Sequence, residues 1–179
     1  MTAEPAEISG SLWVAIEPRS AFVRVVGRAS FAISPALKQF GTAVVNQSCK
    51  RFILDMIECE SADSTFLGIL AGLSMQTSKN GGGQMIIVNL SPKIYETISN
   101  LGLNRITQCY PVGQCPAEMK EKLQHIGQLK QVEIKQAEKK ATAETIMEAH
   151  TDLIRLDQRN APRFNDLLSV LRKDMKHRE

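Results

Sequence analysis

The chain has 179 residues, a mass of 19.8 kDa and a formal net charge of +3, which is the size of one ordinary domain with an appendage. Apolar residues make up 43% and charged residues 23%, so wholesale disorder is excluded. The small net charge gives no reason to expect nucleic-acid binding. Because the apolar stretches are too short to span a bilayer and the acidic start lacks the pattern of a signal peptide, we expect a cytoplasmic protein with no membrane partner.

Charge density divides the chain into two parts. Residues 1–112 hold 17 charged residues, whereas the shorter segment 113–179 holds 24, and no glycine follows Gly127. This change predicts a turn-rich α/β domain over residues 1–112 and a charged C-terminal helical extension over residues 113–179.

Strand and helix signals alternate through the first part. Two β-rich runs, residues 12–16 and 21–26, are separated by a hairpin-like break. Ser34-Pro35 then has the form of an N-cap followed by the first helical position. The nearly continuous apolar run over residues 51–57 predicts a strand covered on both faces.

The same alternation continues to residue 110. Asp63 is suited to cap a second helix, which the glycines at 81–83 end in a turn before a buried strand over residues 84–89. Ser91-Pro92 predicts the start of a third helix, with Gly102 as its left-handed C-cap and a last short strand over residues 106–110. The order β-β-α-β-α-β-α-β predicts a mostly parallel central sheet.

The extension has the pattern of two or three helices. One begins near Cys115, and Pro162 forces a kink or a fresh start further on. Thr145 and Glu148 have the spacing of a capping box, unless they lie inside a helix that begins near Thr142. We expect a helical hairpin whose apolar stripe packs on the α/β domain or mediates a homodimer; the stripe comprises Phe164, Leu167, Leu168 and Leu171.

Metal and cofactor sites are not expected. His125, His150 and His177 lie far apart in the extension, and the four cysteines lack paired CxxC spacing, so we expect free thiols, no metal and no cofactor. A nucleophile at Ser64 or Thr65 would need a histidine base from the extension, because residues 1–112 contain none. Enzyme activity is therefore not expected.

The first turn of the second helix is the strongest candidate site. With Asp63 as N-cap, Ser64 and Thr65 fall in the turn whose backbone N–H groups lack helical partners, and a phosphate on either hydroxyl would be tolerated there. We expect Asp63 to hold both hydroxyls at the domain surface. The simpler alternative is that these residues only cap the helix.

Residues 53–57 (Ile-Leu-Asp-Met-Ile), followed by residues 63–68 (Asp-Ser-Thr-Phe-Leu-Gly), carry a family resemblance. The pair resembles the signature of STAS domains, the sulfate transporter and anti-sigma factor antagonist family, in which a central strand ends in Asp-Ser-Ser/Thr-Gly-Leu-Gly at the start of the second helix. Phe66 stands where the family often has Gly. The resemblance covers roughly residues 11–112 and implies a STAS-like fold.

The resemblance also implies a bacterial signal-transduction protein that regulates transcription. Such a protein docks on an ATP-binding, kinase-like anti-sigma factor or serine/threonine kinase, and a serine/threonine phosphatase is a further partner. By position, the phosphorylated residue is Thr65, with Ser64 second, and the partner-binding residues are Asp63, Ser64, Thr65 and Phe66. Two alternatives stay open: a non-phosphorylated scaffold or sensor STAS protein in a larger signalling assembly, and a small enzyme that uses Ser64 or Thr65.

Overall fold

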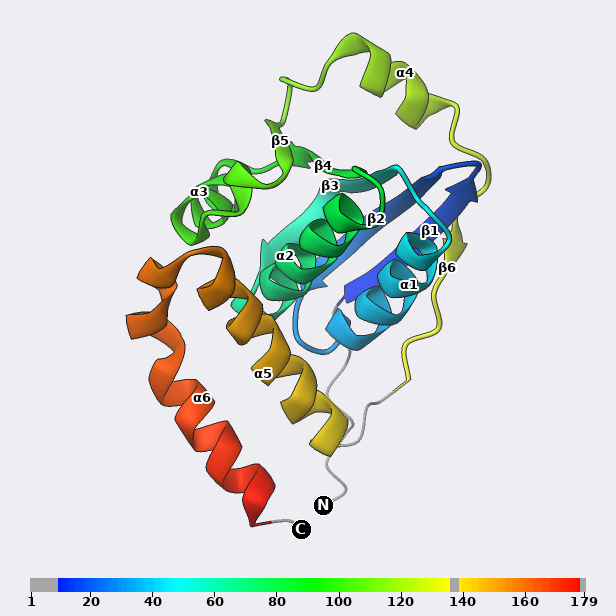
Figure 1. Cartoon of the computed structure of the whole chain (residues 1–179). Coiled ribbons are helices and arrows are strands. Elements are labelled where there is room, and N and C mark those ends of the chain that lie inside the picture. The colour runs from blue at the N-terminus through cyan, green and yellow to red at the C-terminus, as the bar shows by residue number, and fades with distance from the viewer. Residues whose placement is uncertain (1–9, 136–138, 178–179) are drawn as a thin grey trace, which may run out of the picture.

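A single sheet organises the computed structural model, which describes residues 10–135 and 139–177 (Figure 1). Its strand order within those residues is β5-β4-β3-β2-β1-β6. The strands are β1 (Gly10–Glu17), β2 (Ser20–Ala29), β3 (Arg51–Ala62), β4 (Gln84–Leu90), β5 (Gln108–Pro111) and β6 (Lys130–Gln131). β2 to β5 pair in parallel and β1 pairs antiparallel with β2, which confirms the mostly parallel sheet.

The extension is not wholly helical, contrary to expectation. β6 adds to the open edge of the sheet, where Lys130 and Gln131 pair antiparallel with Val14 and Trp13. A strand of two residues is too short to show an alternating pattern in the sequence. It forms because the exposed edge of β1 supplies the hydrogen-bonding partners.

Helices cover the sheet, and most begin where the sequence indicates. They are α1 (Ser34–Asn46), α2 (Ser64–Lys79), α3 (Pro92–Leu101), α4 (Ala117–Gln124), α5 (Lys139–Leu156) and α6 (Ala161–Lys176), with short 3-10 turns at Leu103–Arg105 and Gln158–Asn160. No helix among the described residues is long and apolar enough to cross a membrane.

The helix-start predictions have different outcomes. Asp63 and Ser91 cap α2 and α3 by accepting hydrogen bonds from the backbone N–H groups of Phe66 and Ile94, at 2.8 and 3.3 Å. Ser34 does not cap α1: it lies within the helix and its hydroxyl donates to the Ser30 carbonyl at 2.9 Å. Of the two alternatives for Thr145 and Glu148, the structure has the second: they lie inside a helix, α5, which begins at Lys139.

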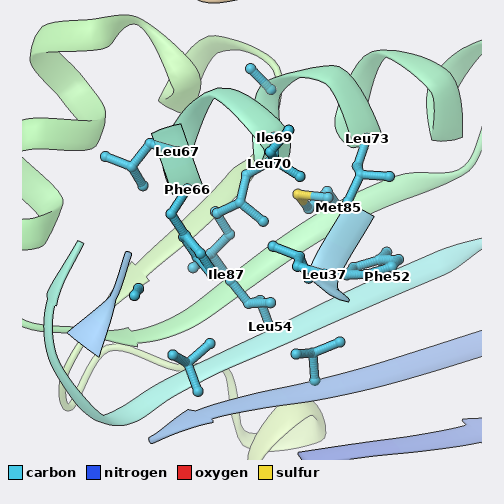
Figure 2. Close-up of a cluster of buried hydrophobic side chains, with 14 of the residues drawn as sticks. Leu37, Phe52, Leu54, Phe66, Leu67, Ile69, Leu70, Leu73, Met85 and Ile87 are labelled. Atoms are coloured by element: carbon cyan, nitrogen blue, oxygen red, sulfur yellow. The ribbon is translucent and has the colours of Figure 1, made fainter. Parts of the chain in front are cut away.

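The core is divided by the sheet. Phe52 and Leu54 of β3 face α1 and α2, where they pack with the apolar side of α2 (Figure 2). Ile53, which points to the opposite face, packs with Phe22 and with the loop and helix around α4, including Cys115. This alternation is the two-residue period of a strand that is buried on both faces.

The α5–α6 hairpin packs on the α/β domain, with α5 lying along α2 (Figure 1). At the turn between its two helices, the Asn160 amide donates to the Leu101 and Leu153 carbonyls at 3.0 and 2.8 Å. Asp157 pairs there with Arg105 and Arg159. Hydrogen bonds from Arg159, more than the charge of Arg105, hold the pKa of Asp157 well below its usual range.

The apolar stripe of α6 is only partly covered. Leu168 is 4% exposed, whereas Leu167 is 38% and Val170 56% exposed. α6 packs mainly on α5, which in turn packs on the α/β domain, and a homodimer through the exposed side of α6 stays a prediction.

Candidate functional site

Asp63 fixes the start of α2 with both of its carboxylate oxygens. The backbone extends through Asp63 (φ −90°, ψ 168°) as the chain leaves β3, and Oδ1 accepts the Phe66 N–H at 2.8 Å. Oδ2 accepts the Phe31 N–H, also at 2.8 Å, from the segment that precedes α1. One carboxylate thus joins two loops at the same end of the sheet and sets the position of the first turn.

The two hydroxyl residues of this turn lie in different environments. Ser64 is half-buried, whereas Thr65 is buried at 5% exposure, so the expectation that both hydroxyls lie on the surface is wrong for Thr65. The reason is that the sheet, α1 and α5 all pack on α2, so that the helix is buried continuously from Thr65 to Ser74.

Phe66 is part of the core rather than of a surface. Its side chain is fully buried among the apolar residues between α2 and the sheet (Figure 2). The sequence places Phe66 among the partner-binding residues, but in this conformation its ring is not accessible to a partner. A ring at this position fills core volume that the glycine of the family signature would leave empty.

His150, on α5, lies against the first turn of α2. Its Nε2 is 2.8 Å from the Ser64 hydroxyl oxygen, and its Nδ1 is 2.7 Å from the Ile146 carbonyl. The carbonyl can only accept, so Nδ1 carries the proton in that contact, and in the neutral imidazole Nε2 then accepts the Ser64 hydroxyl proton. His150 is 2% exposed and its ring meets Phe164 edge-on, with centroids 4.6 Å apart. The histidine that a nucleophile would need does come from the extension, but it is enclosed.

Two glycines let α5 approach α2 closely. A Cβ atom at Gly68 would lie 2.3 Å from the Ala149 carbonyl oxygen and 2.7 Å from the Ala149 Cβ. A Cβ atom at Gly72 would lie 2.4 Å from Oδ2 of Asp152. The four-residue spacing puts both glycines on one face of α2, and this spacing is a signal for close helix packing that can be found in the sequence.

Several other titratable side chains are buried within the fold. Asp55 of β3 is buried and accepts from Arg24 at 3.0 Å and from the Asn89 amide at 2.8 Å. The four cysteines are free thiols, and burial raises the pKa of each. Burial also raises the pKa of Asp152 on α5. Among the described residues, no three histidine, cysteine or acidic side chains form a group that could hold a metal ion.

Solved structures with a similar fold are known. An anti-sigma factor antagonist from Mycobacterium paratuberculosis is 25% identical over 69% of this chain and 98% of its own, with a TM-score of 0.53. SpoIIAA, in its unphosphorylated form, is 14% identical over 64% of this chain and 99% of its own, with a TM-score of 0.50. The Bacillus cell fate determinant SpoIIAA in its phosphorylated form is 15% identical with the same coverage and TM-score.

No curated protein matches the chain in sequence. The family model of the STAS domain matches residues 13–114, which is more than half of the chain and includes β3, Asp63 and the whole of α2. The chain therefore belongs to the STAS domain family.

Proposed function

We propose that this chain is a regulatory binding module of the anti-sigma factor antagonist type. It docks through the first turn of α2 on an ATP-binding, kinase-like anti-sigma factor or serine/threonine kinase, and phosphorylation of Thr65 switches that docking. The observation that carries the proposal is the position of Asp63, Ser64 and Thr65: the acid caps α2 and the two hydroxyl residues form its first turn, at the end of the central strand.

The local electrostatics support a switch that leaves the fold intact. A phosphate brings about −1.5 to −2 charges at pH 7. The N-terminus of α2 carries unpaired N–H groups and the positive end of the helix dipole, which offset part of that charge. A partner docked on the same turn would instead meet a new anion beside Asp63. Because Thr65 is 5% exposed, the turn must be uncovered before a kinase can reach it, and phosphorylation then weakens partner binding at the uncovered turn.

The contact between Ser64 and His150 raises an enzymatic alternative, because a hydroxyl that donates to an imidazole is the arrangement of an activated nucleophile. A substrate would have to approach the hydroxyl to within about 3 Å. His150 is 2% exposed and lies between α2 and Phe164, which leaves the imidazole enclosed by protein. We therefore assign this pair to the packing of α5 on α2 and propose a regulatory protein rather than an enzyme.

The test is affinity capture from the native organism with the full chain, combined with the intact mass of the recovered protein. A kinase-like protein that co-purifies, and a phosphate-sized increment in mass, support the proposal. Thr65→Asp should lose the captured kinase, whereas Thr65→Asn, its uncharged counterpart, should retain it. Equal capture by the two variants would contradict the charge switch. Recovery of a large assembly without a kinase would favour the scaffold alternative.

A further inference from the structure

The face of α2 that carries the candidate docking turn is already occupied by another part of this chain. α5 packs along α2 from Ser64, which donates to His150, to Gly68 and Gly72, which lie against Ala149 and Asp152 (Figure 1). These contacts span more than two turns of α2, beginning at its first residue. A partner that docked on this face would have to take the place of α5.

Polar contacts hold the hairpin near the middle of α5 and at the turn that follows it. Near the middle of α5, Glu148 pairs with Lys38 of α1. At the turn, Asn160 donates to the Leu101 carbonyl and Asp157 pairs with Arg105. The docked position of the hairpin is therefore defined by specific partners on the α/β domain.

The interface continues the main core, which Ala149 and Leu153 of α5 join, but it also encloses polar groups. Of the buried side chains of α5, Ala149 and Leu153 are apolar, whereas Thr145, His150 and Asp152 are polar or ionisable. Burial of a carboxylate opposes docking, which agrees with the direction in which the pKa of Asp152 moves. An interface with small apolar side chains and buried polar groups opens at a lower free energy than a core of large aliphatic residues.

We propose that the α5–α6 hairpin is an autoinhibitory cap on α2. It closes the first turn to a partner and to a kinase, and it must leave α2 before either can act. This proposal rests on the proposed function for its regulatory meaning. A phosphate on Ser64 would replace the hydroxyl proton, so modification there removes the hydrogen bond that this hydroxyl can donate to Nε2 of His150.

The glycine contacts provide a substitution that displaces the cap alone. A methyl group at Gly68 meets the Ala149 backbone, which cannot rotate away, so Gly68→Ala should push α5 off while favouring the helical state of α2. Gly72→Ala is the matched control, because its methyl group meets only the end of the Asp152 side chain. Ala149→Leu creates the same clash from the side of α5 and leaves residues 13–114 unchanged.

The accessibility of the first turn of α2 can be measured by alkylating a thiol introduced by Ser64→Cys with iodoacetamide. Peptide mass spectrometry gives the alkylation rate, and the buried native cysteines serve as internal standards. We expect Gly68→Ala or Ala149→Leu to accelerate alkylation at position 64 by about tenfold or more, and Gly72→Ala to change it by less than about twofold. Hydrogen exchange should show lost protection over residues 142–156 and full protection over residues 51–62.

Equal alkylation rates in all these backgrounds, or unchanged protection of α5 in both displacing variants, would overturn the cap. If Gly68→Ala also exposes β3, Ala149→Leu decides the question, because the domain sequence is intact. Alkylation by iodoacetamide requires no kinase, so it tests the covering of Ser64 independently of the proposed function. Failure to capture a kinase-like partner would overturn the proposed function but not the conclusion that α5 covers Ser64. A captured kinase that binds capped and displaced chains equally would overturn autoinhibition and leave the proposed function standing.

Discussion

The carboxylate of Asp63 gives the most direct prediction about how the site is built. Its two oxygens accept two backbone N–H groups, from Phe66 within α2 and from Phe31 before α1. Asp63→Ala removes both bonds, whereas Asp63→Asn keeps one oxygen for the helix cap and loses the other acceptor. The pair of variants therefore separates the cap from the link between the two loops.

The expected losses follow from these two bonds. Removal of an N-cap side chain costs about 1 kcal/mol. A hydrogen bond to a charged group contributes about 1.5–3 kcal/mol, which we reduce to about 1 kcal/mol because Phe31 is half exposed. Asp63→Ala should thus lower the free energy of unfolding by about 2 kcal/mol and Asp63→Asn by about 1 kcal/mol.

Urea unfolding, followed by circular dichroism at pH 7, measures both values. The denaturant slope should stay at the wild-type value, because neither substitution alters the surface exposed on unfolding. A loss below about 0.5 kcal/mol for Asp63→Ala, or equal losses for the two variants, would refute the assignment of separate roles to the two oxygens.

Three further predictions concern the core, the hairpin and a turn. Leu54→Ala should lower the free energy of unfolding by about 2–5 kcal/mol, whereas Ile57→Ala, at a half-exposed position of the same strand, should cost much less; similar losses in urea would contradict the burial pattern. The lowered pKa of Asp157 stabilises the folded state above the ordinary pKa of about 3.9, so the hydrogen-exchange protection factors of α5, which correct for slower intrinsic exchange in acid, should fall as the pH drops below about 4. The fall should be smaller in Asp157→Asn, and an equal fall in that variant would contradict this role. Gly102→Ala should cost about 1–2 kcal/mol in thermal unfolding, because φ is +85° there; an unchanged melting temperature would refute the strain.

The fold of the α/β domain could be predicted because its signals are local. The apolar run of β3, the cap at Asp63 and the glycine after α3 each act within a few residues, and all three are present as expected. The prediction for Ser34 was wrong because a serine before a proline fits both the N-cap and the first helical position. The backbone N–H of Ser34 donates to the Ser30 carbonyl at 3.2 Å, which fits the helical position.

The environment of the candidate site could not be predicted in the same way. The partner of Ser64 is 86 residues away, and the burial of Thr65 depends on how helices from both parts of the chain pack around α2. Such contacts have no local period or spacing. The most informative sequence signal is the pair Gly68 and Gly72. It indicates that another segment packs closely on α2, but it does not identify that segment as α5.

In the proposed function, phosphate at the start of α2 controls partner binding. The most direct measurement incubates the wild-type chain and Thr65→Val with the captured kinase-like partner and ATP, maps phosphate by peptide mass spectrometry, and titrates each product against the partner. We expect phosphate on residue 65 of the wild type, none on Thr65→Val, and binding weakened by about tenfold or more only in the phosphorylated chain. Labelling of Thr65→Val equal to that of the wild type, or undiminished binding of the phosphorylated chain, would contradict the claim.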